Sequence, residues 1–180
     1  MKLLRFALCT LLFVAATAVQ SAELDPRYKS MGQIMLTFDG STYEFVVPWD
    51  TKSNRPYAKE KEIAGQRYFT LSGSTVTETG KPGRTRFSVS FMLLYGMQKI
   101  TDISLSTVQE GKRSRYSLFG ESSSARFENF ELSEDGAIKT QIEATLAQMN
   151  TEIKTGTEAL EGAPPLLVQG EITVSLSEPD

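Results

Sequence analysis

Residues 84–97, RTRFSVSFMLLYGM, form the most apolar run of the chain outside its N-terminal segment, and they decide the fold. Large side chains stand at every second position of this run, namely Phe87, Val89, Phe91, Leu93, Tyr95 and Met97. A period of two with bulky and β-branched residues is typical of a β-strand that buries one face. Each large side chain stabilises the fold by roughly 1.5–3 kcal/mol when it is buried. The run therefore predicts a central strand against which the rest of the chain packs.

The opposite face of this predicted strand changes along its length. It begins with Ser88 and Ser90 and continues with Met92 and Leu94. A polar start and an apolar end indicate that a second sheet or a crossing segment covers only the second half of this face.

Short alternating runs joined by turns flank the central strand on both sides. Asp39-Gly40 separates runs at 34–38 and 43–47, and Asp-Gly is favoured in two-residue hairpin turns because both central residues need a positive φ. Residues 80–83, GKPG, predict a turn between the run at 66–79 and the central strand. Further runs typical of strands lie at 103–105, 116–119, 127–132 and 166–177.

Strands at this regular spacing predict one all-β domain over residues 23–180, an antiparallel β-sandwich of about eight to ten strands. A closed antiparallel β-barrel is the alternative, because the sequence does not show whether the first and last strands pair. We expect residues 66–79 to form one strand that bends at a bulge near Gly73.

Two segments are harder to assign. Residues 49–65 contain proline, asparagine and several charges, so they predict a long surface connection with a turn of helix as an option at 58–63. Residues 137–149 fit a helical stripe and a strand face equally well. We favour a strand there, because every element that precedes it is expected to be a strand.

The N-terminus predicts export. Lys2 and Arg5 precede an apolar stretch at 6–16, and small residues suited to cleavage follow it. The stretch is shorter than the roughly 20 apolar residues that a membrane-spanning helix needs. We therefore expect residues 1–22 to be a cleaved signal peptide that sends the protein to the periplasm, with an extracellular location as the alternative and no integral membrane segment after cleavage.

Composition limits the chemistry of the mature chain. The sequence has no histidine, and its single cysteine, Cys9, lies in the predicted signal segment. Ser-His-Asp and Cys-His catalysis and the usual zinc sites are therefore excluded, and we expect no cofactor. Loss of residues 1–22 changes the formal net charge from −3 to −5, with 17 basic against 22 acidic residues. A mildly acidic chain of this kind is a poor candidate for binding nucleic acid.

Two groups of residues are candidate ligand sites. Lys112, Arg113 and Arg115 are expected at the tip of a hairpin whose predicted turn is 110–114, and they could bind phosphate or sulfate groups, although such clusters are also common in solvated turns and at sheet edges. Trp49, Tyr57 and Tyr68 could form an aromatic platform for a sugar ring or a peptide, although a lone tryptophan after a strand often covers the end of a core.

Carboxylates are the remaining candidates for acid–base chemistry. The pairs considered are Glu128 with Glu131 and Glu134 with Asp135. Neighbours at these spacings in a strand or turn do not normally converge on one point, so a glycan hydrolase of the two-carboxylate type is the weaker interpretation.

The sequence thus predicts an exported, non-catalytic binding or structural module of the periplasm or cell envelope, whose partner is an unknown envelope protein, glycan or lipophilic ligand. One alternative function is a barrel that carries a lipophilic small molecule in a cavity lined by Phe87, Phe91 and Tyr95. The other is the carboxylate-based glycan hydrolase.

Overall fold

The computed structural model describes residues 23–109, 111–151 and 158–179. These residues form antiparallel strands without a helix, as the sequence predicts. The strands are β1 (Tyr28–Phe38), β2 (Ser41–Asp50), β3 (Arg55–Pro56), β4 (Ala58–Ile63), β5 (Gln66–Val76), β6 (Pro82–Leu94), β7 (Met97–Gln109), β8 (Lys112–Ser117), β9 (Ser124–Leu132), β10 (Ala137–Gln148) and β11 (Leu166–Ser175). The predicted signal segment, 1–22, lies outside the described residues.

Eight of the strands close into a barrel. They follow the order β2-β1-β11-β10-β8-β7-β6-β5, and β5 pairs back to β2 through Val46 and Ser74. The remaining strands are attached at the margins, β3 to β2, β4 to β5 and β9 to β10. The all-β prediction is confirmed in the form of its barrel alternative, and the favoured β-sandwich is not confirmed.

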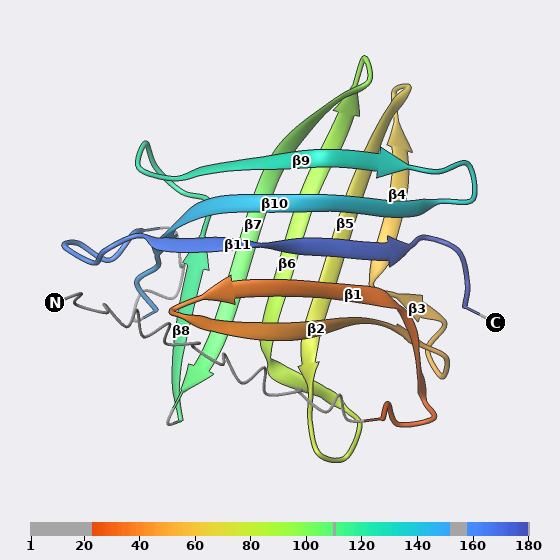
Figure 1. The fold of residues 1–180 in the computed structure, drawn as a ribbon, viewed down its shortest axis with the longest axis horizontal. Helices are drawn as coiled ribbons and strands as arrows, with labels where there is room; N and C mark the ends of the chain where they lie inside the picture. Colours follow the sequence, from red (N-terminus) through yellow and green to blue (C-terminus); the bar gives the residue numbers. More distant parts are fainter. Residues whose placement is uncertain (1–22, 110, 152–157, 180) are drawn as a thin grey trace, which may run out of the picture.

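The barrel is flattened into two layers. Strands β9, β10, β11, β1 and β2 lie in front of β4–β8 and run across them (Figure 1). The layers are joined on one side by the β2–β5 contact and on the other by a short β10–β8 pairing, Ala147 with Ser117 and Gln148 with Tyr116. Two crossing layers of this kind bring their inner faces together over a single core.

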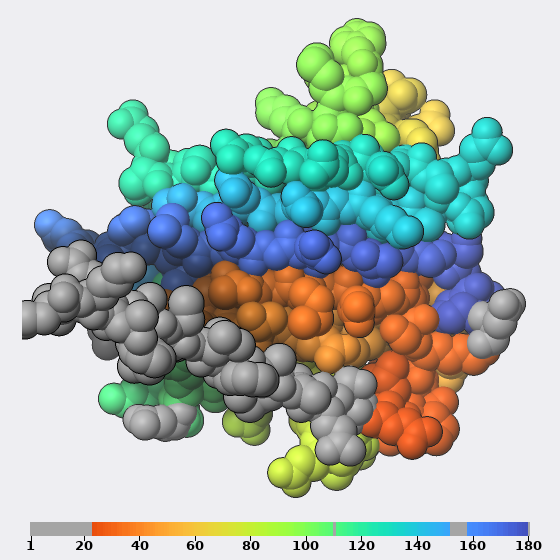
Figure 2. Space-filling model, in the orientation of Figure 1, coloured from red at the N-terminus to blue at the C-terminus, as the bar shows by residue number. Residues whose placement is uncertain are grey.

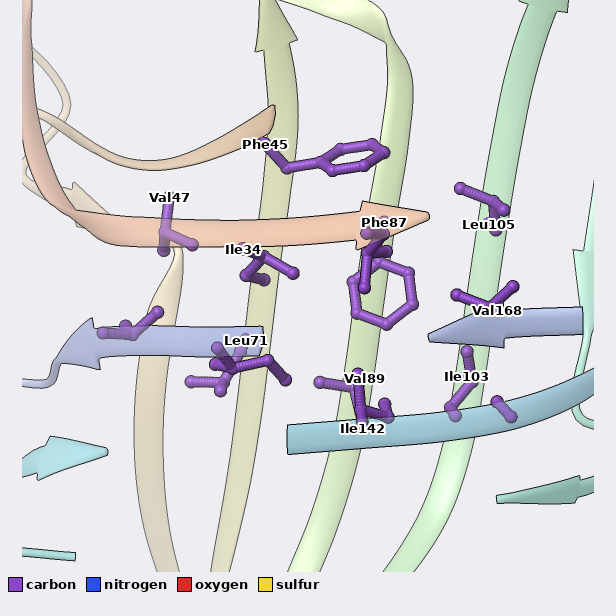
Figure 3. Packing of buried hydrophobic residues seen from close by; sticks show 14 of the residues in the cluster. Ile34, Phe45, Val47, Leu71, Phe87, Val89, Ile103, Leu105, Ile142 and Val168 are labelled. Atoms are coloured by element: carbon purple, nitrogen blue, oxygen red, sulfur yellow. The ribbon is translucent and has the colours of Figure 1, made fainter. Parts of the chain in front are cut away.

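The predicted central strand lies in the middle of the rear layer. Phe87, Val89 and Phe91 of β6 are at most 1% exposed and belong to the same buried cluster as Ile142 and Val168 of the front layer. Figure 3 shows four members of this cluster, Phe87, Val89, Ile142 and Val168. Phe91 alone contacts three rings, those of Phe69, Phe127 and Phe130. Side chains fill the interior, and the largest fully buried ones come from both layers: Phe45, Phe69, Phe87, Phe91, Ile34, Leu36, Leu71, Ile103, Leu105, Ile138, Ile142 and Leu146.

The predicted C-terminal end of the central strand, at Met97, is wrong. Strand β6 stops at Leu94, and Tyr95-Gly96 forms a turn into β7 in which both residues have positive φ, 51° and 79°. Tyr95 is 94% exposed and Met97 66% exposed, at a hairpin tip that projects beyond the rest of the surface (Figure 2). The sequence does not predict this turn because its first residue is tyrosine, whereas asparagine or aspartate usually precedes glycine in turns of this type.

The prediction that residues 49–65 form a long surface connection is also wrong. Strand β2 continues to Asp50, β3 pairs with it, and β4 pairs with β5 from Ala58–Leu71 to Ile63–Gln66. The proposed turn of helix at 58–63 is therefore strand. The sequence does not predict β4 as a strand because β4 is an edge strand whose charged side chains are exposed to water, so it lacks alternating apolar residues.

Most of the other strand predictions are confirmed, but the strand predicted at 116–119 is β8, which begins earlier, at Lys112, and ends at Ser117. Residues 137–148 form β10, and Asp39-Gly40 forms a hairpin turn with positive φ at both residues. Strand β5 is one strand whose register with β6 shifts between Ser74 and Val76, close to the predicted bulge at Gly73. The described residues contain no helix of the length and apolarity needed to cross a membrane.

Candidate functional site

The outer face of the rear layer is covered by hydroxyl groups. It is the surface of β5–β8 that points away from the viewer in Figure 1. Because side chains alternate along a strand, burial of Phe87 and Val89 turns Ser88 outward. The hydroxyls form cross-strand pairs: Ser72 Oγ lies 2.8 Å from Ser88 Oγ, and Thr70 Oγ1 lies 3.2 Å from Ser90 Oγ.

A groove with a volume of about 360 Å³ lies on this face. Its charged lining residues are all cationic, namely Arg55, Lys59, Arg86 and Arg113. Its hydroxyl groups come from Thr70, Ser72, Ser74, Ser88, Ser104 and Ser106. We call this surface the cationic groove. A concave surface with positive charge and hydroxyl donors favours anions, even though the chain as a whole has a net charge of −3.

Two arginines of the cationic groove, Arg86 and Arg113, lie on either side of Ser106 in the strand order. Arg113 Nε donates a hydrogen bond to Ser106 Oγ at 2.9 Å, and Ser106 is the register partner of Arg86 on the other side. Arg86 Nε donates to the Gly83 carbonyl oxygen at 3.3 Å. Each Nε is thus held by the protein, which directs the rest of each guanidinium group.

The terminal nitrogens of both guanidinium groups remain available. Within the described part of the chain, the ion pairs involve Arg27, Arg67 and Arg126, and none involves Arg86 or Arg113. Arginine binds oxyanions through two parallel N–H donors. Arg86 and Arg113 together could therefore hold one sulfate, phosphate or carboxylate group above Ser106.

The positive surface continues past the groove. A second hollow of about 380 Å³ is lined by Arg84, Val108 and Gly111, together with Arg86 and Arg113. Both hollows therefore share the same two arginines, and Arg84 extends the cationic surface toward the β7–β8 turn.

The predicted cationic cluster is only partly at this site. Arg113 lines the groove, whereas Lys112 and Arg115 are exposed residues of β8 that do not line it. Lys112 adjoins the turn, but Arg113 and Arg115 lie within the strand rather than at a hairpin tip, which corrects that part of the prediction.

Four cations of these two hollows, Arg86, Arg84, Arg55 and Lys59, are not among the site residues predicted from the sequence. A signal for the first two was present, because Arg84, Arg86, Ser88 and Ser90 alternate with the buried residues of the central strand. Positions of that kind on a strand share one face.

The three predicted aromatic residues do not form a platform together. Tyr57 lines the cationic groove, and the Arg55 guanidinium lies over its ring, 5.4 Å from the centroid. Trp49 lies in β2 opposite Pro56 and packs against the core, and Tyr68 donates from its hydroxyl group to Gln66 Oε1 at 2.9 Å. No ring contact joins any two of these three residues in the described ranges.

The candidate acidic pairs lie on the β9–β10 hairpin of the front layer. Glu128 forms an ion pair with Arg126 at 2.9 Å, and Glu131 lies opposite Lys139 in the sheet. Asp135 lies in the turn beside Glu134, where hydrogen bonds from the Ser133 hydroxyl and the Ala137 N–H lower the pKa of its carboxyl group. These contacts give the carboxylates local structural partners.

The three residues proposed to line a carrier cavity are also separated. Phe87 and Phe91 are buried among other core side chains, whereas Tyr95 is exposed at the β6–β7 tip, so its predicted inward position is wrong.

Comparison with known proteins gives no relative. No family model, no curated protein and no solved structure matches this chain. The site must therefore be interpreted from its own geometry.

Proposed function

We propose that this protein is an exported, non-catalytic binding module of the periplasm or cell envelope, and that its cationic groove holds an anionic group of the ligand. The observation that carries the proposal is the pair Arg86 and Arg113 on either side of Ser106, in a groove whose charged lining residues are all cations.

The chemistry of the groove supports binding rather than catalysis. Arginine stays protonated at every physiological pH, so it contributes charge and donors but no proton transfer. The lining residues include no carboxylate and no cysteine, and the whole chain has no histidine. Serine hydroxyls without a neighbouring base are weak nucleophiles.

Export is supported by the N-terminal sequence alone, with Lys2 and Arg5 before a short apolar stretch.

The experiment is titration calorimetry of the protein with sulfate and with phosphate at low ionic strength. We expect saturable binding of at least one anion, and loss of that binding in the double variant R86Q/R113Q. The matched control is K139Q, because Lys139 is an exposed cation of the front layer. Thermal melting of each variant checks that the fold is retained. Equal anion binding by R86Q/R113Q and the unmodified protein would refute the proposal.

A further inference from the structure

Three of the four cations of the groove lie on a run of five adjacent strands, and the fourth, Arg55, lies on β3. Lys59 belongs to β4, Arg86 to β6 and Arg113 to β8, and these strands follow the order β4-β5-β6-β7-β8. Neighbouring strands are separated by about 4.8 Å, so the backbone positions of β4 and β8 lie roughly 19 Å apart.

One small anion cannot use all of this surface. A sulfate or phosphate that accepts hydrogen bonds from Arg86 and Arg113, at the usual distance of about 2.7–2.9 Å, lies where the groove adjoins the second hollow. Lys59 and Arg55 on one side, and Arg84 in the adjoining hollow, then remain without an anionic partner among the described residues. Several anionic groups on one chain would use the whole set.

We propose that the ligand is a linear anionic polysaccharide that lies across β4–β8, with successive sulfate, phosphate or carboxylate groups on Lys59, on the Arg86–Arg113 pair and on Arg84. This inference rests on the proposed function and specifies the ligand class of the same groove.

The surface between the cations favours a sugar backbone. The hydroxyl pairs Ser72–Ser88 and Thr70–Ser90 lie on β5 and β6, two of the strands between β4 and β8, and on β7 the next residues across are Ser104 beside Ser88 and Asp102 beside Ser90. A hydroxyl group both donates and accepts hydrogen bonds, which matches the hydroxyls of a sugar. Tyr57 at the margin adds an aromatic ring, a surface that suits the apolar face of a pyranose.

Other polyanions fit this surface less well. Inorganic polyphosphate has no hydroxyl donors and no apolar face to match the serines and Tyr57. Single-stranded nucleic acid relies on aromatic rings that stack on successive bases. Tyr57, which is partly buried, is the aromatic residue of the groove that reaches the surface, because the other ring of its lining, that of Phe87, is buried.

The experiment compares chain lengths. Heparin-derived oligosaccharides of increasing length, from the disaccharide upward, are titrated into the protein by calorimetry at fixed ionic strength. We expect the affinity to rise by about tenfold or more with length and then to level off, because contacts after the first are made by the same molecule. A neutral dextran oligosaccharide of equal length should show no binding.

Substitutions test where the bound oligosaccharide lies on the protein surface. K59Q should weaken binding of the longest oligosaccharide by about two- to fivefold, the range of one exposed ion pair, and so reduce the gain in affinity with chain length. R86Q/R113Q should abolish binding at every length, and K139Q should change neither.

Each alternative outcome has a distinct meaning. Equal affinities for the disaccharide and the longest oligosaccharide would overturn the inference and leave the anion site in place. Tighter binding of polyphosphate or an oligonucleotide of the same charge, or equal binding of neutral dextran, would overturn the ligand class. Absence of binding for every anion, sulfate included, would overturn the proposed function as well.

Discussion

Asp50 is the residue whose electrostatic environment is most clearly defined. Its buried carboxylate accepts from Arg27 Nε at 2.9 Å and from the Arg27 terminal nitrogen, and it also accepts from the Lys52 backbone N–H at 3.1 Å. These bonds tie the start of β1 to the end of β2. The Arg27 hydrogen bonds, which outweigh the effect of burial, hold the pKa of Asp50 well below its usual range.

The first prediction concerns the pH dependence of stability. Because the folded pKa of Asp50 is depressed, its contribution is fully present above the unfolded value of about 3.9 and is lost as the pH falls below it. We expect D50N to lower the free energy of unfolding at neutral pH and to make its decline below about pH 4 shallower. Urea unfolding between pH 2 and pH 7 measures both effects.

The control for this prediction is D102N, because Asp102 is exposed and forms no ion pair with any described residue. Parallel stability curves for D50N and the unmodified protein across the acid range would contradict the assignment.

At the scale of elements, strands β1 and β11 approach each other unusually closely at Gly170. A Cβ placed on Gly170 would lie 1.9 Å from the Met35 carbonyl oxygen and 2.9 Å from the Leu36 Cα. Both of these are backbone atoms, which cannot rotate away as a flexible side chain can. Glycine is needed here because the two backbones leave no room for a methyl group.

We therefore predict that G170A destabilises the protein by about 1–3 kcal/mol, the usual cost of overpacking in a closely packed region. The measurement is the free energy of unfolding in urea. E171A is the matched control, because Glu171 is the adjacent residue of the same strand and its side chain is exposed. A G170A protein as stable as E171A would show that the strands separate there at little cost.

The β6–β7 hairpin shows which elements the sequence could and could not predict. Alternation predicts the buried face of β6 correctly as far as Phe91, and Leu93 is partly buried. It fails at Tyr95, because the residue adopts the left-handed conformation, which costs roughly 1–2 kcal/mol for a non-glycine residue. The extensive β6–β7 pairing, from Arg86–Ser106 to Leu94–Met97, holds it in place.

At the scale of the whole molecule, the two layers share one core and are joined on both sides. Front-layer residues such as Ile142 and Val168 belong to the same buried cluster as Phe87 and Leu71 of the rear layer (Figure 3). Neither layer can bury its apolar face alone, so we expect the barrel to unfold as one cooperative unit.

The chain offers a direct test of this cooperativity. Trp49 is the only tryptophan, and it lies on β2 of the front layer beside the closure with β5. We predict that its fluorescence transition in urea coincides with the far-ultraviolet circular dichroism transition. Two separated transitions would show that the layers unfold independently.

The sequence by itself determined the all-β class, the central strand and most of the buried face, because side-chain alternation is a local property of each strand. It also determined the absence of histidine and cysteine chemistry from the described residues. Only the tertiary structure decided that the sheet closes, since closure depends on the pairing of Val46 with Ser74, far apart in the chain.

Pairing between distant strands also explains why the candidate site could not be predicted as one surface. Lys59, Arg86 and Arg113 are scattered in the sequence and come from three different strands. Strand pairing places them on one outer face, and strand order is a non-local result that period-two patterns do not encode. The residue types of the groove were therefore visible in the sequence, and their assembly into one surface was decided by the fold.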